Sequence, residues 1–170
     1  MVVIVFGLPG SGKSYFASGL ARIVRADYIN SDRVRKEILA QRTYSKQEKE
    51  TVYNKMLATM KEDQEQNRNV VLDATFHKKE TRELFVKEME GRGGIYFIEV
   101  TSDENLIRGR LKNARPDSEA DFKVYKIISR ENEPMRQSHL VLQSTNDNID
   151  QMLQKACDYL KWKNDKRTNQ

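Results

Sequence analysis

The chain has 170 residues, of which 38% are hydrophobic and 32% charged, and its 30 basic and 25 acidic side chains give a formal charge of +5. This length allows one well-buried core without room for a second domain, and the mild positive charge permits an anionic substrate but does not require one. The single cysteine, Cys157, excludes an internal disulfide, and no apolar run approaches the roughly 20 residues of a membrane span, so we expect a cytoplasmic protein with no membrane attachment.

The chain begins with a predicted buried strand, residues 2–6, followed by a glycine-rich loop. Residues 7–14 read GLPGSGKS and fit the P-loop pattern GxxxxGK(S/T) at every fixed position. The glycines let backbone N–H groups turn toward phosphates, and a helix beginning near Lys13 adds a positive N-terminus. We expect Lys13 to reach the β- and γ-phosphates of ATP and Ser14 to bind Mg²⁺ through its hydroxyl. Nucleotide binding is thus assigned to Gly7, Pro9, Gly10, Ser11, Gly12, Lys13, Ser14 and Tyr15.

A second predicted strand, residues 26–29, ends just before Asp32 and a predicted helix, residues 33–41. The carboxyl ends of parallel strands gather at one edge of an α/β sheet, so Asp32 should lie on the same edge as the P-loop. There its carboxylate can accept the proton of an attacking hydroxyl or hold a metal-bound water. The structural alternative is that Ser31 or Asp32 caps the helix.

A long predicted helix, residues 45–67, precedes a third strand, residues 69–72, which ends in Asp73. An acidic residue at the end of a buried strand in a P-loop protein commonly acts on the Mg²⁺ shell, so Asp73 is predicted to serve Mg²⁺ through water or to contact substrate. The alternative is a carboxylate bonded only to backbone N–H groups of the turn. His77, in the turn before a predicted helix over residues 78–90, is interpreted as a surface or capping residue.

A fourth strand, residues 95–100, and a helix, residues 103–112, lead into a basic segment, residues 108–122. Four basic residues are clustered there: Arg108, Arg110, Lys112 and Arg115. Pro116 favours a break in the helix, so the segment can fold over the nucleotide as a lid and bring guanidinium groups to the transferring phosphoryl group. The alternative is a solvated basic helix end whose arginines favour the helix dipole.

The remaining predicted elements are a helix over residues 118–131, a strand over 139–143 and a helix over 149–162. Five strands that alternate with helices predict an α/β, three-layer P-loop NTPase fold with a five-stranded parallel sheet. The expected strand order is 2-3-1-4-5. We assign residues 1–163 to one domain, with the lid at about residues 108–122, and residues 164–170 to a polar tail.

Several segments together resemble a family: GLPGSGKS, SDRVR, VVLDAT, RGRLKNAR and PDSEADF. They are similar to the small P-loop kinases grouped around the kinase domain of polynucleotide kinases, with zeta-toxin-like and gluconate-kinase-like relatives. The resemblance implies ATP, Mg²⁺ and phosphoryl transfer to a hydroxyl, with Asp32 as general base and Arg35 on a substrate phosphate. It also implies Arg110 and Arg115 as lid arginines, although their spacing is one residue wider than the family pattern. Phe76 departs from the pattern as well, because relatives often carry asparagine there.

The leading hypothesis is an ATP-dependent kinase with a hydroxyl acceptor, either a nucleic-acid 5′ end or a small metabolite such as a sugar, a nucleoside or an aminoglycoside-like alcohol. The sequence shows no aromatic stacking platform or basic stripe for nucleic acid. The other hypothesis is a nucleotide-binding ATPase or switch without an acceptor. Such proteins usually place a glutamate or glutamine to position water, and no glutamate adjoins Asp73. No obligate protein partner is expected.

Overall fold

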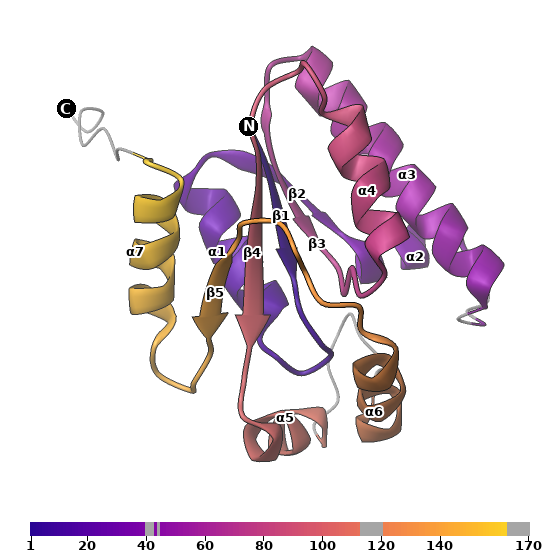
Figure 1. The fold of residues 1–170 in the computed structure, drawn as a ribbon, viewed down its shortest axis with the longest axis vertical. Coiled ribbons are helices and arrows are strands. Elements are labelled where there is room, and N and C mark those ends of the chain that lie inside the picture. Colours follow the sequence, from indigo (N-terminus) through magenta and orange to yellow (C-terminus); the bar gives the residue numbers. More distant parts are fainter. Residues whose placement is uncertain (40–42, 44, 113–120, 163–170) are drawn as a thin grey trace.

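The computed structural model describes residues 1–39, 43, 45–112 and 121–162, whose arrangement is shown in Figure 1. The strands are β1 (Val2–Phe6), β2 (Ala26–Asn30), β3 (Asn69–Asp73), β4 (Ile95–Thr101) and β5 (Leu140–Gln143). They form one sheet in the order β2-β3-β1-β4-β5, and every pair of neighbouring strands is parallel. The predicted strand order is therefore confirmed, and the chain has the three-layer P-loop NTPase fold.

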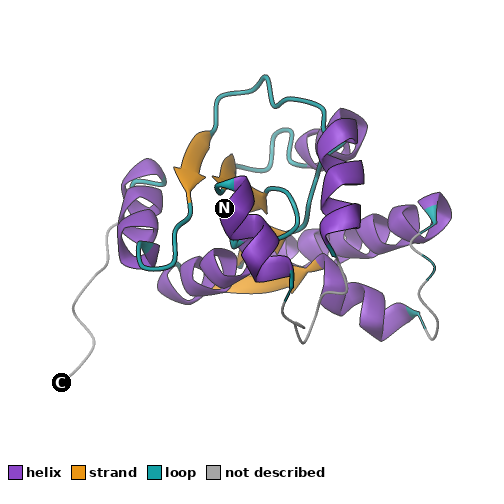
Figure 2. Cartoon of the chain, turned by 90° about the horizontal axis from the view of Figure 1, so that it is seen from below, coloured by secondary structure: helices purple, strands orange, loops and turns teal. Residues whose placement is uncertain are grey.

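The helices of the described residues are α1 (Lys13–Ile23), α2 (Ser31–Ile38), α3 (Lys46–Glu65), α4 (Lys79–Glu88), α5 (Glu104–Leu111), α6 (Phe122–Glu131) and α7 (Ile149–Tyr159). α1 and α7 cover one face of the sheet and α2, α3 and α4 cover the other. α5 and α6 lie beyond the carboxyl ends of the strands, and Figure 2 views the molecule from that side. Within the described ranges, no helix is both long enough and apolar enough to cross a membrane.

The central strand β1 is buried along its whole length. Successive side chains of a strand point to opposite faces, so Val3 and Val5 pack with α1 and α7, while Ile4 packs with α3 and α4. Met56 and Met60 of α3, predicted as core residues, are fully buried on the second face. This central position carries the loop that follows β1 to the middle of the edge where the strands end.

Helix α2 begins earlier than predicted and has a different cap. Asn30 is the N-cap, and its Oδ1 accepts a hydrogen bond from the backbone N–H of Arg33 at 3.0 Å. The structural alternative, in which Ser31 or Asp32 caps this helix, is therefore wrong, and both residues lie in its first turn. The described part of the helix ends at Ile38, because Leu39 has extended backbone. Asp32 is thus available for a role other than capping.

Helix α6 has a defined start at Phe122. Asp121 caps it, with Oδ1 accepting from the backbone N–H groups of Lys123 at 2.8 Å and Val124 at 2.9 Å. The predicted helix began at residue 118, and residues 113–120 lie outside the described part of the chain. The last helix, α7, ends at Tyr159 rather than at residue 162, and Lys161 beyond it has a positive φ of 52°.

Candidate active site

The glycine-rich loop between β1 and α1 has a backbone that only glycine accommodates. A Cβ on Gly7 would lie 2.2 Å from the carbonyl oxygen of Val100 in β4. Gly12 has φ of 92°, and a Cβ there would lie 2.8 Å from Oγ of Ser144. Helix α1 starts directly afterwards at Lys13, so its N-terminal N–H groups and positive dipole end point toward the loop. The geometry matches that expected of a phosphate-binding loop.

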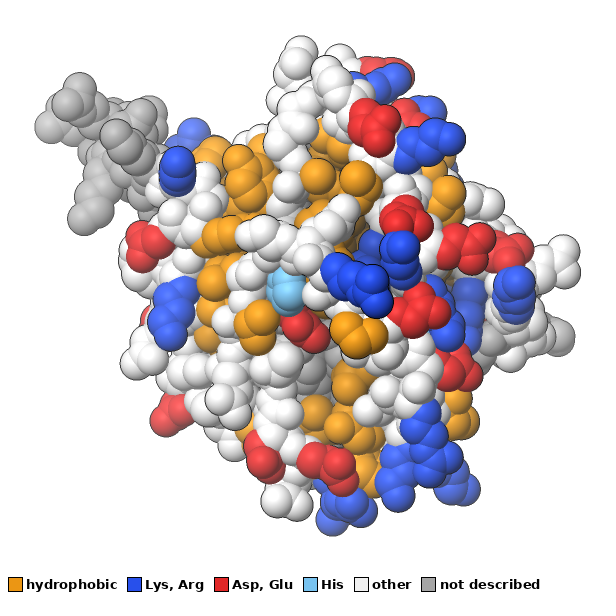
Figure 3. All heavy atoms as spheres, viewed as in Figure 1, with side chains coloured by type: hydrophobic (Ala, Val, Ile, Leu, Met, Phe, Trp, Pro, Cys, Tyr) orange, Lys and Arg blue, Asp and Glu red, His pale blue; other side chains and the backbone are white. Residues whose placement is uncertain are grey.

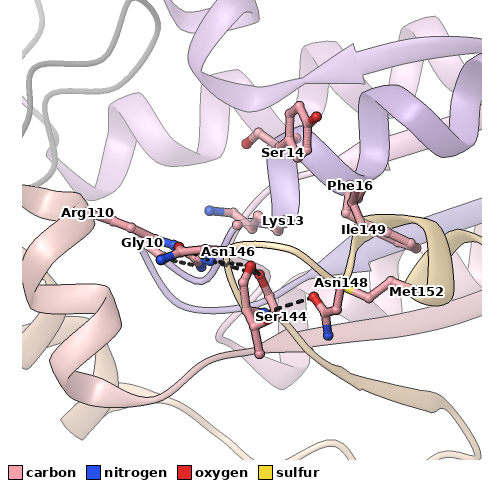
Figure 4. Close-up of a pocket in the computed structure, with 13 residues that line it drawn as sticks. Gly10, Lys13, Ser14, Phe16, Arg110, Ser144, Asn146, Asn148, Ile149 and Met152 are labelled. Carbon is pink, nitrogen blue, oxygen red and sulfur yellow. Dashed lines mark hydrogen bonds between the residues drawn. The ribbon is translucent and has the colours of Figure 1, made fainter.

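A cavity of about 380 Å³ lies on one side of this loop (Figure 4). Its wall comes from the P-loop, the start of α1, α5, the segment after β5, and α7. The lining residues are Gly10, Gly12, Lys13, Ser14, Tyr15, Phe16, Arg110, Ser144, Thr145, Asn146, Asn148, Ile149 and Met152. Apolar side chains on one part of the wall and polar groups on another are typical of sites for small ligands, and the volume is in that range. We name it the nucleotide cavity, after the role that we propose for it below.

Arg110 joins the P-loop to the segment after β5, as Figure 4 shows. Its Nη1 donates to the carbonyl oxygen of Ser11 at 3.2 Å, and its Nη2 donates to the carbonyl oxygen of Thr145 at 2.8 Å and to Oγ of Ser144 at 3.2 Å. Burial lowers the pKa of this guanidinium from its usual value. Arg110 was predicted to act on the phosphoryl group from a lid; in the structure its contacts hold the wall of the nucleotide cavity together.

Arg108, another candidate lid arginine, lines neither the nucleotide cavity nor the second cavity described below. Arg115 lies outside the described residues. Arg108 is exposed, donates to Glu104 at 3.3 Å, and stacks over the ring of Phe122 at 4.0 Å from its centroid. The contact with Phe122 links α5 to the first residue of α6.

A second cavity, of about 300 Å³, lies on the other side of Lys13 and Ser14. Its wall comes from the P-loop, α2, α3, the turn after β3, and α6. The lining residues are Pro9, Lys13, Ser14, Asn30, Ser31, Asp32, Arg35, Lys49, Tyr53, Thr75, His77, Val124, Ile127 and Ile128. We name it the acceptor cavity, after the role that we propose for it below. Lys13 and Ser14 line both cavities, so the two spaces meet at the P-loop lysine and serine.

Asp32 lines the acceptor cavity and is held by Arg35. Nη1 of Arg35 donates to Oδ1 of Asp32 at 2.8 Å, and Nε of Arg35 donates to Oε1 of Glu48 at 2.8 Å. Glu48 is buried, and its other carboxylate oxygen accepts from the hydroxyl of Thr43 at 2.9 Å. No described residue bonds to Oδ2 of Asp32, so this oxygen is available to a ligand.

Asp73 ends β3 in a fully buried position beside Asn30, its partner in the register of β2 and β3. Its Oδ2 accepts from the Tyr28 hydroxyl and from Nδ2 of Asn30, both at 2.6 Å. Burial and the Asp73 carboxylate raise the pKa of Tyr28, which therefore stays a donor. The described partners of Asp73 are thus side chains, rather than the backbone N–H groups of the turn.

The residues around Asp73 fit a hydrated Mg²⁺. Oδ1 of Asp73 is buried without a hydrogen-bond partner among the described residues. The Tyr28 hydroxyl that donates to Oδ2 of Asp73 also lies 3.4 Å from the backbone carbonyl oxygen of Ser14, so Ser14, whose side chain carries a hydroxyl, is close to Asp73. The described residues contain no group of three or more His, Cys, Asp or Glu side chains that could hold a metal by themselves. Mg²⁺ commonly keeps several waters and binds one or two protein ligands together with substrate phosphates, so this sparse set of oxygens is sufficient.

His77 is neither a surface residue nor a cap, contrary to the sequence-based interpretation. It is 7% exposed, lines the acceptor cavity, and precedes the N-cap Lys78. Its Nδ1 lies 3.4 Å from Oγ1 of Thr75, and its Nε2 lies 3.7 Å from Oε2 of Glu131. Burial, followed by the positive charges of Lys49 and Lys78, lowers the pKa of His77, so the imidazole is neutral near pH 7. The cavity therefore presents a neutral ring at this position.

A sequence profile of the family AAA_33, described as AAA domain, matches residues 2–135. The chain belongs to this family. The matched range of this AAA-domain protein includes the P-loop, Asp32, Asp73 and α6. It covers every residue that lines the acceptor cavity, whereas the part of the nucleotide cavity formed by residues 144–152 lies outside it. No curated protein sequence is significantly similar to the chain.

The AAA-domain protein resembles several solved structures over nearly its whole length. A sugar kinase from Janibacter sp. HTCC2649 has a TM-score of 0.73 at 14% identity, with 94% of each chain covered. A gluconokinase from Sinorhizobium meliloti 1021 has a TM-score of 0.69 at 16% identity, covering 94% of this chain and 91% of that one. The Mycobacterium tuberculosis APS kinase, in complex with AMPPNP and APS, has a TM-score of 0.67 at 20% identity, covering 94% and 96%. At these identities the likeness establishes a shared fold.

Proposed function

We propose that this protein is an ATP-dependent kinase that transfers the γ-phosphoryl group to a hydroxyl of a small acceptor molecule. One observation carries the proposal: the two cavities meet at Lys13 and Ser14, and Asp32 lines the acceptor cavity but not the nucleotide cavity. ATP would occupy the nucleotide cavity with its γ-phosphate beside Lys13. The acceptor would occupy the second cavity with its hydroxyl beside Asp32.

In this arrangement the acceptor oxygen attacks the γ-phosphorus, the bond from that phosphorus to the β,γ-bridging oxygen breaks, and ADP leaves. The hydroxyl proton passes to the carboxylate of Asp32, whose Oδ1 is already held by Arg35. Lys13 stabilises the negative charge on the phosphoryl oxygens. Mg²⁺, bound by Ser14 and through water by Asp73, would neutralise charge on the β- and γ-phosphates.

Several features support a small acceptor over a polynucleotide 5′ end. Arg35, which the family resemblance assigns to a substrate phosphate, bonds instead to Asp32 and Glu48. Phe76 is fully buried in the core, so no side chain at that position reaches the acceptor. On the face in Figure 3, basic and acidic side chains are interspersed over much of the surface. Two of the structural neighbours are described as a sugar kinase and a gluconokinase.

An ATPase or switch without an acceptor fits the site less well. Hydrolysis needs a group that positions water, usually a glutamate or glutamine. Among the described residues, neither type lines the acceptor cavity. A cavity of about 300 Å³ with an apolar wall is also larger than a single attacking water requires.

Transfer of label from γ-labelled ATP to pools of sugars, hydroxy acids, nucleosides and a 5′-hydroxyl oligonucleotide tests the proposal. We expect a labelled small molecule, and we expect Asp32→Asn to lower kcat at least about 100-fold with unchanged ATP binding. Glu37→Gln, an exposed acid on the same helix, is the matched control. Label on the oligonucleotide alone, with steep loss of activity at high salt, would favour the polynucleotide reading. Release of phosphate with no labelled product would favour the ATPase.

A further inference from the structure

The wall that α6 contributes to the acceptor cavity is entirely apolar. Val124, Ile127 and Ile128 line the cavity, and their spacing of three and four residues places them on one side of the helix. Another side of α6 packs against α5 through the buried Tyr125. Apolar side chains are visible at the surface in the lower part of Figure 3, where α5 and α6 lie.

The contact with α5 does not account for the second apolar side of α6. The exposed fraction is 36% for Val124 and 55% for Ile127, although both are β-branched hydrophobic residues. A surface helix usually turns one apolar stripe toward its core and polar residues elsewhere. An additional apolar stripe that borders a cavity is surface that a ligand can bury, with a gain in binding free energy proportional to the area covered.

Lys49 brings an unpaired positive charge to the same cavity. It is half-buried in the first turn of α3, and its side chain has no hydrogen bond or ion pair with any described residue. The dipole of its own helix does not compensate this charge, because a cation near a helix N-terminus is disfavoured. Arg35, by contrast, is paired with Asp32 and Glu48. The neighbouring imidazole of His77 supplies no negative charge.

We propose that the acceptor is a hydroxyl compound with an apolar ring or chain, which packs on Val124, Ile127 and Ile128, and an anionic group, which pairs with Lys49. This inference rests on the proposed kinase function, because it places the reacting hydroxyl at Asp32. The anion would neutralise Lys49 and also interact favourably with the N-terminus of α3. A neutral sugar would leave Lys49 unpaired, and a purely polar acid would leave the α6 wall exposed.

A matched set of acceptors separates these properties in an assay with γ-labelled ATP. The set contains 4-(hydroxymethyl)benzoate, its neutral analogue 4-(hydroxymethyl)benzamide, the polar acid gluconate, and glucose. We expect the benzoate to be the best acceptor. Lys49→Gln should raise KM for the benzoate about tenfold and leave KM for the benzamide nearly unchanged. Ile127→Ser should raise KM for both ring compounds by about the same factor.

Two controls lie outside the cavity. Lys46→Gln changes a lysine of the same helical turn whose side chain is 92% exposed, and Val141→Ser changes an exposed valine of β5. Neither should alter the preference among the four acceptors. Transfer to gluconate or glucose in preference to the benzoate, or KM values that do not respond to Lys49→Gln and Ile127→Ser, would overturn the acceptor class and leave the kinase standing. Absence of transfer to any hydroxyl compound would overturn both.

Discussion

Arg35 holds Asp32 in place from one turn further along α2, with Nη1 of the arginine 2.8 Å from Oδ1 of the aspartate. The arginine is itself fixed by Glu48 of α3, which lies 2.8 Å from its Nε. The hydrogen bond from the guanidinium fixes the orientation of Oδ1 of Asp32. Oδ2 stays available to a ligand in the acceptor cavity. The proposed base is therefore positioned by a second helix as well as by its own.

Glu48→Gln tests this arrangement, because the amide keeps the size of the side chain but removes its charge. We expect kcat for phosphoryl transfer to fall about tenfold while KM for ATP stays the same, since Glu48 does not line the nucleotide cavity. Steady-state kinetics with the best acceptor provide the measurement. Glu50→Gln, on the same helix and paired only at 3.8 Å with the exposed Lys46, should retain full activity. Unchanged kcat in the Glu48 variant would contradict the positioning role.

The sequence around Glu48 contains a recognisable motif, but this motif does not predict the contact that the Glu48 side chain makes. Ser45 and Glu48 have the spacing of a capping box, and Oγ of Ser45 does accept from the backbone N–H of Glu48 at 3.2 Å. In a capping box the glutamate side chain would return to the N-cap backbone, whereas here it bonds to Arg35. A tertiary partner with a buried charge overrode the local preference. The strand order and the P-loop were predictable because they depend on local pattern and chain order alone.

Gly12→Ala should impair both folding and nucleotide binding. The φ of 92° at this position is unfavourable by about 1–2 kcal/mol for a residue with a Cβ. The new methyl group would also lie 2.8 Å from Oγ of Ser144. We expect a lower melting temperature and at least a tenfold weaker Kd for ATP, as an order of magnitude. Gly109→Ala in α5 is the control. A Cβ at this position meets nothing within 4 Å, and alanine should stabilise the helix by about 0.5–1 kcal/mol relative to glycine. Equal behaviour of the two variants would refute the argument.

Arg110→Lys distinguishes a structural clamp from a cation that acts on the transferring phosphoryl group. The contacts of Arg110 with the P-loop and the segment after β5 require a forked donor, which lysine lacks. We therefore expect KM for ATP to rise about tenfold with a smaller change in kcat. Arg108→Lys, at an exposed position of the same helix, should change neither constant. A large loss of kcat at constant KM would instead support the catalytic role predicted from the sequence.

Arg110 and His77 show why parts of the site could not be predicted. Arg110 was predicted to lie in a lid over the nucleotide, with a solvated basic helix end as the alternative, and His77 was interpreted as a surface or capping residue of a polar turn. Both are instead enclosed by elements distant in the chain, the segment after β5 for Arg110 and the end of α6 for His77. Hydrophobic periodicity predicts the helices but not their contacts beyond the sheet edge, where α5 and α6 meet the P-loop.

The lowered pKa of His77 makes stability depend on pH in a defined direction. Burial, Lys49 and Lys78 lower this pKa from the ordinary value of 6.5, while Glu131 and Glu133 oppose the shift. Below about pH 6.5 the unfolded chain binds a proton that the folded chain still excludes, so the free energy of unfolding falls as pH decreases through this window. His77→Gln removes the contribution. Melting temperatures between about pH 7.5 and about pH 5.5 should therefore decline more for the wild-type protein than for the variant, and parallel curves would show that His77 is not the group responsible.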